Sequence, residues 1–275
     1  MYYRHNLDYK YPERSDEHMI SVRHVRDVNF DENYPYFQKS FGFKCKRVLL
    51  FVLLNGVLSW LLPITHGLRI HGRKKLREHK ALFENGLITV SNHVYMWDFI
   101  SVMLAMRPRL GYFPAWGPNM EGPNGPWIRM SGGIPIPTDS MKAMKKFKQV
   151  MEEAFETTKW MHFYPEGSMW YYYPDIRPLK KSAFQYAVKY NRPVVPITMS
   201  FRPCKGIRKI FRKQPLVDLH IGDPLLPNQE LSPAKATLEL QQKTYHMMQV
   251  MNGIHPGDPT YNTDLEIANY KCTMR

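Results

Sequence analysis

Residues 86–98 read Gly86-Leu87-Ile88-Thr89-Val90-Ser91-Asn92-His93-Val94-Tyr95-Met96-Trp97-Asp98. The apolar run 86–90 predicts a buried strand, and polar residues follow it directly. In an uninterrupted helix, five steps of about 100° would place the side chains of His93 and Asp98 about 140° apart, so they would not touch. They meet if His93 lies on the turn and Asp98 in the first turn of the next helix. An imidazole held there by a carboxylate is suited to act as a general base on a hydroxyl group.

The His-x4-Asp spacing has a second interpretation. His93 can be an ordinary loop residue, and Asp98 can be a helix-start residue whose carboxylate caps the helix. The spacing also arises by chance in a chain with 11 histidines. Other parts of the chain therefore decide between a catalytic pair and a structural turn.

The chain of 275 residues has a formal net charge of +14, which calls for an anionic partner. A membrane surface, a nucleic acid and a phosphorylated substrate all meet that requirement. Acidic residues among the N-terminal basic ones offset their charge, so a nucleic acid is not an expected partner. The three cysteines (Cys45, Cys204 and Cys272) are isolated, so we expect neither a disulfide framework nor a cysteine metal site, and we expect a reducing compartment.

Residues 1–40 are polar and rich in tyrosine, and we interpret them as an N-terminal arm. Residues 41–67 are a predicted membrane-associating segment, because the run 48–64 has no charged side chain. Basic residues flank this run on both sides, whereas a single spanning helix carries them mainly on one side. This favours a segment that enters one leaflet from the cytoplasmic face and returns, with its flanks on anionic lipid. A helix buried in a soluble core is the alternative.

Residues 68–225 alternate between short apolar strands and amphipathic helices. The strand patterns cover 68–71, 86–90, 160–164, 193–199 and 216–221, and the helix patterns cover 99–106, 141–157 and 183–190. This alternation predicts an α/β fold, with a mixed, mostly parallel sheet flanked by helices and a site beyond the carboxyl ends of the strands. The stretch 111–138, rich in glycine and proline, is predicted to be an irregular loop.

Residues 226–275 are predicted to form a C-terminal helix and tail. Ser232 is placed as the N-cap and Pro233 as the first helical residue, and the helix is expected to end near Asn252.

Three motifs in order resemble those of the glycerolipid acyltransferase family, which includes the bacterial 1-acyl-glycerol-3-phosphate acyltransferases. They are Asn92-His93-x4-Asp98, Pro165-Glu166-Gly167-Ser168 and Val194-Val195-Pro196-Ile197. The resemblance covers about residues 68–223. It implies a membrane-associated enzyme of the α/β class that transfers an acyl group from acyl-CoA or acyl carrier protein to a lipid hydroxyl, without a cofactor.

Two departures from the family pattern concern phosphate binding. The family's second motif ends in an arginine, whereas Gly132-Gly133-Ile134-Pro135-Ile136-Pro137 leads here to Thr138-Asp139. The third motif carries an arginine after its Ser or Thr, whereas Met169 follows Ser168 here. The segment Leu179-Lys180-Lys181-Ser182-Ala183 does resemble the family's basic helix start. The departures put the acceptor in question more than the reaction.

The resemblance and the residues together give each candidate a role. His93 takes the proton of the acceptor hydroxyl, and Asp98 fixes the tautomer and stabilises the imidazolium. Glu166, Gly167 and Ser168 are assigned to substrate binding, and the Gly167 N–H is a candidate donor to an oxyanion or phosphate. The cations expected to bind a substrate phosphate are Arg177, Lys180 and Lys181. The expected acceptor is 1-acyl-glycerol-3-phosphate, giving phosphatidic acid, with a lysolipid lacking a phosphomonoester as the alternative.

Two other classes of function fit parts of the sequence. A metal hydrolase would use His93, Asp98, His162 and Glu166, but no compact metal-ligand motif is present, and we expect no metal. A non-catalytic, basic membrane-binding or nucleic-acid-binding module would explain the charge. Such a module would give His93 and Asp98 no role.

Overall fold

The computed structural model describes residues 3–5, 7–138, 140–206, 208–258 and 261–262. Cys272 and the end of the predicted C-terminal tail lie outside them. The chain divides into two compact units. Unit 1 contains Met1–Ile20, Trp60–Met106 and Phe163–Arg275, and unit 2 contains Ser21–Ser59 and Arg107–His162. The predicted domain boundaries stay predictions.

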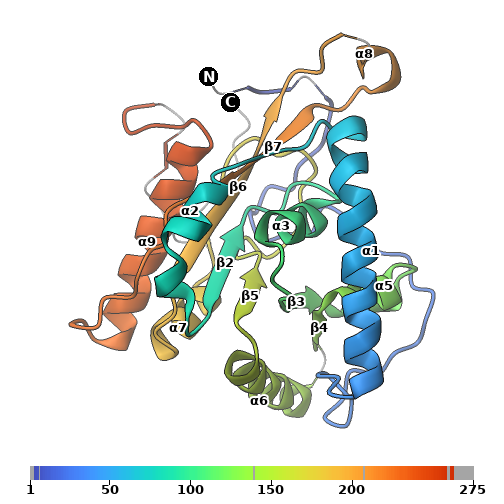
Figure 1. Cartoon of the computed structure of the whole chain (residues 1–275), viewed down its shortest axis with the longest axis vertical. Helices are drawn as coiled ribbons and strands as arrows, with labels where there is room; N and C mark the ends of the chain where they lie inside the picture. Colours follow the sequence, from blue (N-terminus) through green and yellow to red (C-terminus); the bar gives the residue numbers. More distant parts are fainter. Residues whose placement is uncertain (1–2, 6, 139, 207, 259–260, 263–275) are drawn as a thin grey trace. The chain divides into compact units, whose positions relative to one another are not determined.

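Unit 1 is built on a twisted sheet (Figure 1). Its strands lie in the order β1 (Arg69–His71), β7 (Leu216–Ile221), β6 (Val194–Arg202) and β2 (Leu87–Ser91). The pairs β1–β7 and β2–β6 are parallel, and β6–β7 is antiparallel. A further strand of the sheet, β5 (Trp160–Phe163), crosses the boundary between the units, and only Phe163 belongs to unit 1. The predicted mixed, mostly parallel sheet is confirmed.

Helices flank this sheet, as the alternating pattern predicted (Figure 1). The α-helices of unit 1 are α2 (Arg73–Glu78), α3 (Asp98–Met106), α7 (Ser182–Lys189), α8 (Arg208–Phe211) and α9 (Pro233–Met251), and η1 (Lys80–Phe83) is a 3-10 helix. Helix α9 begins after Ser232, as predicted, and packs on α7 and β6. Every residue of β2 is buried, so the turn that follows it stands on a rigid support.

Unit 2 contains regular structure where an irregular loop was predicted. Within 111–138 lie β3 (Phe113–Trp116), α4 (Gly117–Glu121), α5 (Gly125–Ser131) and β4 (Gly133–Ile136), and β3 pairs parallel with β4. The prediction was wrong because it treated every proline as a breaker. Pro118 and Pro126 occupy the first turns of the two helices, where a missing N–H costs nothing. The predicted helix 141–157 is confirmed as α6 (Met141–Thr157).

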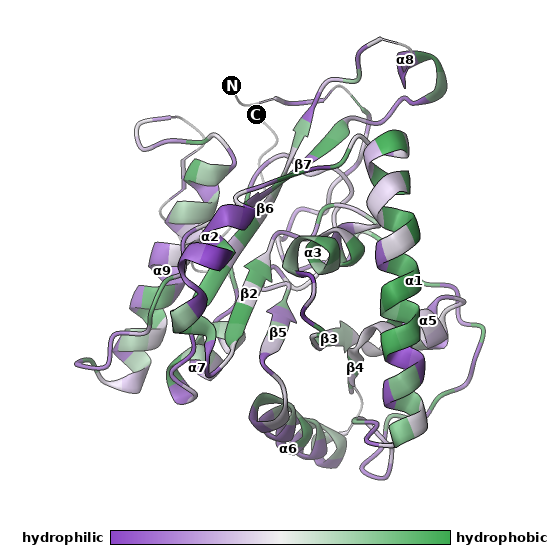
Figure 2. Ribbon diagram, viewed as in Figure 1, coloured by the Kyte–Doolittle hydropathy of each residue, from purple (hydrophilic) through white to green (hydrophobic). Residues whose placement is uncertain are grey.

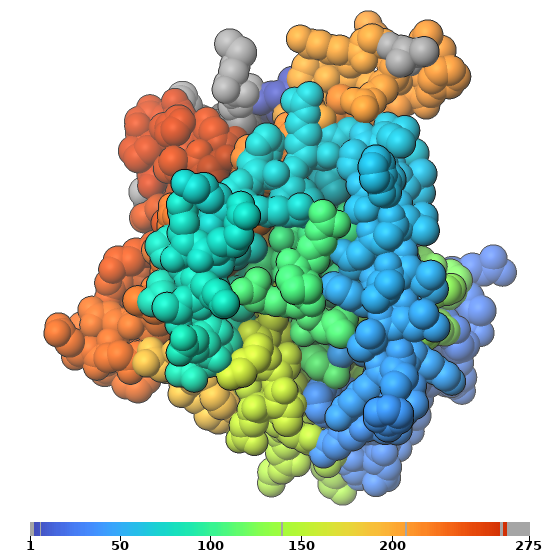
Figure 3. Space-filling view, in the orientation of Figure 1, coloured from blue at the N-terminus to red at the C-terminus, as the bar shows by residue number. Residues whose placement is uncertain are grey.

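The apolar N-terminal segment forms one continuous helix, α1 (Phe41–Thr65). At 1.5 Å per residue its 25 residues extend about 38 Å, enough to cross the ~30 Å hydrocarbon core of a bilayer. The helix has no internal turn, so the predicted return within one leaflet does not occur between its ends. Exposed apolar side chains recur at helical spacing along one stripe: Leu49, Leu53, Val57, Trp60 and Ile64. Figure 2 shows that hydrophobic residues predominate along α1, and Figure 3 shows atoms of α1 on the face in view. Only 17% of its 18-residue apolar stretch is buried, which does not fit the alternative of a buried core helix.

One of the basic residues before the apolar run has a structural role. The guanidinium of Arg47 is buried in unit 2, where it donates to Met130 O at 3.2 Å and also to Gly111 O. It lies 4.0 Å from the centre of the Tyr112 ring. Arg47 therefore joins α1 to the rest of unit 2 and does not count among the lipid-facing cations.

Candidate active site

The turn after β2 is fixed by a buried asparagine. The Asn92 side chain donates to Met199 O at 2.9 Å and accepts from Met199 N at 2.7 Å, which ties the turn to β6. His93 follows on the turn, and Asp98 is the first residue of α3. Both placements were predicted from the spacing. Asn92 belongs to the first motif, but the motif alone does not predict its anchoring role.

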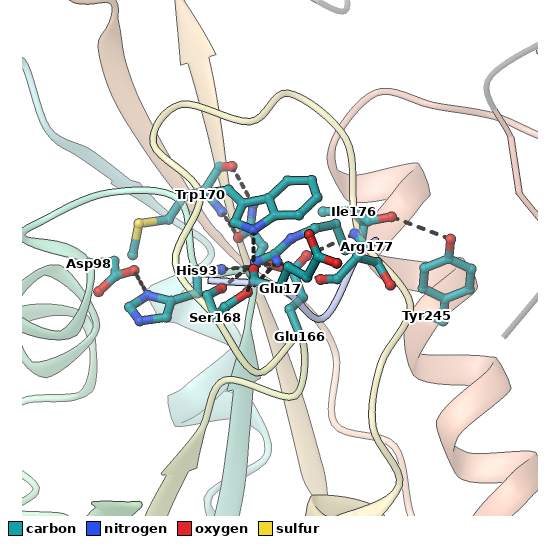
Figure 4. Close-up of polar contacts among 12 residues, drawn as sticks. Glu17, His93, Asp98, Glu166, Ser168, Trp170, Ile176, Arg177 and Tyr245 are labelled. Carbon is teal, nitrogen blue, oxygen red and sulfur yellow. Dashed lines mark hydrogen bonds and ion pairs between the residues drawn. The ribbon is translucent and has the colours of Figure 1, made fainter. Parts of the chain in front are cut away.

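His93 and Asp98 form a hydrogen-bonded pair (Figure 4). The imidazole Nδ1 lies 2.5 Å from Asp98 Oδ2, and the side chains are 22% and 3% exposed. Because the carboxylate engages Nδ1, the proton of a neutral imidazole is held on that nitrogen, and Nε2 is left to accept another. This is the geometry of an oriented general base.

Tyr164, which the sequence analysis did not select, completes the surroundings of this pair. Its hydroxyl donates to Asp98 Oδ1 at 2.9 Å, and its ring stacks on the His93 imidazole with centroids 3.9 Å apart. Burial and the charge of Asp98 raise the pKa of Tyr164 well above its usual value, so the phenol remains a donor. The available signal was its position: a tyrosine at the carboxyl end of a buried strand, directly before Pro165.

Tyr164→Phe is expected to lower kcat by up to about tenfold and to leave both KM values unchanged. The substitution removes one hydrogen bond to a charged carboxylate, a difference of about 1.5 kcal/mol, and keeps the stacked ring. Steady-state kinetics with both substrates varied measures the split. A change confined to KM would show that Tyr164 contacts a substrate instead of positioning Asp98.

Glu166 connects the first and third motifs. Its Oε2 accepts from the backbone N–H of His93 at 3.0 Å and from Arg177 Nη2 at 2.9 Å, and its Oε1 accepts from the Arg177 N–H at 2.8 Å. The carboxylate is fully buried. The structure therefore places the Glu166 carboxylate against three protein donors and away from solvent, and its assigned role in acceptor binding stays a prediction.

Arg177 is also buried, and both terminal nitrogens of its guanidinium donate hydrogen bonds (Figure 4). Its Nη1 donates to Ser168 Oγ and to Ser15 O, each at 2.9 Å, and its guanidinium lies 4.4 Å from the centre of the Trp170 ring. The structure thus brings Glu166, Ser168 and Arg177 together beneath His93. It places Arg177 away from solvent, in contrast to the expected phosphate-binding position.

Described residues of the N-terminal arm between Arg4 and His18, here called the strap, lie over the third-motif loop 168–177. The Glu17 carbonyl accepts from Ser168 Oγ at 2.9 Å and from Trp170 Nε1 at 2.8 Å. Arg4 makes an ion pair with Asp175 at 3.0 Å. The sequence analysis missed this role of the arm, because nothing in the pattern of residues 1–20 indicates which segment 150 positions later they contact.

Helix α9 supports the same loop from another side. Asn252 Nδ2 donates to Pro174 O at 2.6 Å, and Tyr245 Oη donates to Ile176 O at 3.3 Å (Figure 4). The loop 168–177 is therefore held between the strap and α9, which explains how an irregular segment can position a buried ion pair.

The other predicted residues of the third-motif region lie at its exposed edge. Gly167 has a φ of 89°, and its N–H donates to Tyr164 O at 3.0 Å, so a turn uses the donor that was a candidate for an oxyanion. A Cβ at Gly167 would lie 2.7 Å from Lys180 Nζ, so the glycine makes room for that exposed lysine. Lys181 is exposed at the start of α7. His18, a residue of the strap, has a pKa below the usual value for histidine. Burial is the largest cause, and the positive charge of Lys180 is the next.

The metal-hydrolase alternative finds no support in the arrangement of these side chains. Among the residues that the structure describes, no group of three or more His, Cys, Asp and Glu side chains could hold a metal ion. Glu166, one of its four proposed ligands, is bound to Arg177 instead.

Comparisons with known proteins identify the domain that carries this site. Residues 67–200 match the family model described as Acyltransferase. These residues form an acyltransferase domain. The family predicted from the three motifs is confirmed, and the His93–Asp98 pair, Tyr164 and Glu166 all lie within the acyltransferase domain.

A solved structure has a fold similar to that of this chain. It is that of the 1-acyl-sn-glycerophosphate (LPA) acyltransferase PlsC from Thermotoga maritima, with a TM-score of 0.51 and 18% sequence identity. The match covers 80% of this chain and 86% of that one. A comparison with curated proteins found no match.

Proposed function

We propose that this acyltransferase moves a fatty acyl group from acyl-CoA or acyl carrier protein to the hydroxyl of a lysophospholipid, with 1-acyl-glycerol-3-phosphate as the acceptor and phosphatidic acid as the product. The observation that carries this proposal is the His93–Asp98 pair, with its 2.5 Å contact at the end of a buried strand. A partly exposed base held by a buried carboxylate suits the activation of a hydroxyl group. A non-catalytic binding module would not require a histidine and an aspartate in this arrangement.

The proposed mechanism is a direct transfer. His93 Nε2 takes the proton of the acceptor hydroxyl as its oxygen attacks the thioester carbonyl, and Asp98 stabilises the imidazolium that forms. The tetrahedral intermediate then expels the thiolate, which receives the proton from His93. One C–O bond forms and one C–S bond breaks, so the products are an ester and a free thiol, and no cofactor takes part.

The protein groups beneath His93 act as positioning residues in this proposal. Glu166 holds the His93 backbone and is itself held by Arg177, so the ion pair fixes the base in space. Lys180 and Lys181, both exposed, are proposed to contact a phosphate of one of the substrates. The Thermotoga protein with the same fold is an LPA acyltransferase, which favours a phosphorylated acceptor.

An assay with purified protein tests the proposed function. The full chain in detergent is incubated with labelled acyl-CoA or acyl-loaded carrier protein and with lysophosphatidic acid, lysophosphatidylcholine or monoacylglycerol. We expect labelled phosphatidic acid as the main product. Preferred acylation of lysophosphatidylcholine or monoacylglycerol would identify the alternative acceptor, and membrane binding without turnover of any acceptor would favour the non-catalytic module.

We also propose that α1 inserts into the membrane, with the acyltransferase domain at the cytoplasmic face. Leu53→Glu is expected to shift the protein from the membrane pellet to the soluble fraction, because an acidic side chain near the middle of an inserted helix costs about 3 kcal/mol. Sedimentation with liposomes measures the shift.

The matched control for this experiment is Leu238→Glu on α9. Leu53 and Leu238 are 55% and 50% exposed, so the same charge is introduced at sites of similar exposure. The control is expected to sediment like the wild type. Equal behaviour of the two variants would mean that α1 does not enter the lipid. Point variants are preferable to deletion of the N-terminus, since Arg4, Ser15 and Glu17 also hold the third-motif loop.

A further inference from the structure

A pocket of about 330 Å³ lies within unit 1, beside the turn that carries His93. Its walls come from segments far apart in the sequence: the strap, the residue after α1, the turn between His93 and Asp98, the third-motif loop, and the segment between β6 and β7. These segments contribute, among others, Tyr9, His66, Tyr95, Trp97, Tyr172 and Arg212. The pocket is thus lined mainly by aromatic rings, and Arg212 is the residue with a fixed charge among the described residues that line it.

Two polar groups of this lining have no hydrogen-bond partner among the described residues. They are the buried hydroxyl of Tyr95 and the buried Nε of Arg212. Arg212 is held in place by Nη2, which donates to Tyr172 Oη at 3.3 Å and to Pro215 O at 3.2 Å. A buried donor without a partner costs about 1–3 kcal/mol, so both groups favour a ligand that brings acceptor atoms.

The protonation states in the pocket favour an anion. Burial raises the pKa of Tyr95, so its phenol is a donor at neutral pH. Burial and the nearby charge of Arg212 lower the pKa of His66 to about 4, so its imidazole is neutral at neutral pH. Arg212 therefore supplies positive charge to a pocket that also offers a phenol donor. A guanidinium and a phenol suit the oxygen atoms of a phosphate ester.

We propose that this pocket binds the phosphate group of the acceptor lysophospholipid, with Arg212 as its principal cation. This inference rests on the proposed function. In 1-acyl-glycerol-3-phosphate the reacting hydroxyl and the phosphate are carried by adjacent carbons of one glycerol. A phosphate site must therefore adjoin the base that deprotonates the hydroxyl. His93 itself is not among the described residues that line the pocket, but Tyr95 and Trp97, which do line it, lie between His93 and Asp98 in the chain.

The nucleotide phosphates of acyl-CoA fit this place less well, because the whole pantetheine arm separates them from the thioester. The surroundings of the pocket also suit a lipid. Met96 and Trp97 at the pocket are exposed apolar residues, and so are Ile210 and Phe211 on α8, directly before Arg212. Arg208 of α8 donates to Pro63 O at 3.2 Å near the end of α1. Arg212 accordingly fills the role of the arginine that the second motif lacks.

The test compares Arg212→Gln with Lys213→Gln, an exposed cation next to it that does not line the pocket. We expect Arg212→Gln to raise the KM for 1-oleoyl-glycerol-3-phosphate by about 10- to 100-fold, since it removes a charge-assisted contact, and to leave the KM for acyl-CoA unchanged. Lys213→Gln should match the wild type. With 1-oleoyl-glycerol, which has no phosphate, Arg212→Gln and the wild type should have equal KM values.

A binding measurement tests the phosphate site without requiring enzymatic turnover. Trp97 lines the pocket, so micellar 1-oleoyl-glycerol-3-phosphate should change the tryptophan fluorescence of the wild type, and Trp97→Phe should remove most of that change. Tyr95→Phe, which keeps the ring, should weaken binding by up to about tenfold.

Each other outcome has a separate meaning. An unchanged acceptor KM in Arg212→Gln, with a raised value in Lys180→Ala, would overturn the inference and leave the proposed function intact. A raised KM for acyl-CoA alone would assign the pocket to the donor and also overturn it. Saturable binding that depends on Arg212, in a wild type without acyl transfer, would support the phosphate site and contradict the proposed function.

Discussion

His93→Ala is expected to lower the rate of acyl transfer by about 10²- to 10⁴-fold while the protein remains folded. A general base contributes a factor of this size, and the substitution removes it completely. The imidazole is partly exposed and lies on a turn, so its loss leaves the buried ion pair of Glu166 and Arg177 intact. Initial rates with labelled acyl donor measure the loss, and circular dichroism shows whether the fold is kept.

The surface histidine His255 provides the control, and His255→Ala should retain full activity. Because His93 and Asp98 act as a unit, adding Asp98→Asn to His93→Ala should lower the rate little further. Near-normal turnover in the His93→Ala variant would rule out this base and direct attention to another group near the thioester. A further large loss in the double variant would mean that Asp98 acts independently of His93.

The residues around His93 could be predicted because their arrangement is local. An apolar run of strand length, a polar turn and a helix with an acidic first residue place His93 and Asp98 within reach of each other. The structure has β2 end at Ser91 and α3 begin at Asp98, as that argument requires. Backbone geometry over a few residues decides such a contact, and the sequence contains that geometry directly.

The groups that support the pair could not be predicted in the same way. Glu166 reaches His93 across 73 positions, and Glu17 reaches Trp170 across 153. Tertiary packing decides these contacts, and the hydrophobic periodicity of the sequence does not predict them. Arg177 illustrates this limit, because arginine is usually exposed and its burial could not be predicted from its position near a motif. Its burial against Glu166 follows from the strap and α9, both distant in sequence.

The pocket beside His93 shows the same limit. Its walls come from segments between Tyr9 and Gln214 in the chain, and no two of those segments form a recognisable motif together. The sequence did show that the second motif lacks its arginine. It could not show which of the 38 lysines and arginines in the chain would line the pocket.

Arg177→Met is expected to destabilise the folded protein by about 3–5 kcal/mol, because it leaves the Glu166 carboxylate buried without its charged partner. For a chain of this size that loss corresponds to a fall in Tm of roughly 6–20 °C, measurable by thermal unfolding in detergent. The matched control is Arg14→Met, whose side chain is 69% exposed and whose ion pair with Asp16 should contribute less than about 1 kcal/mol.

The double variant Arg177→Met/Glu166→Gln separates the ion pair from simple packing. Replacing the carboxylate by a neutral amide removes the unpaired buried charge, so the double variant should recover much of the lost Tm. Its kcat should remain low, because Oε2 of Glu166 also fixes the backbone of His93 and an amide oxygen accepts that N–H more weakly. If Arg177→Met instead kept the wild-type Tm and raised the acceptor KM, Arg177 would be a substrate ligand, and the buried pair would have to open during the reaction.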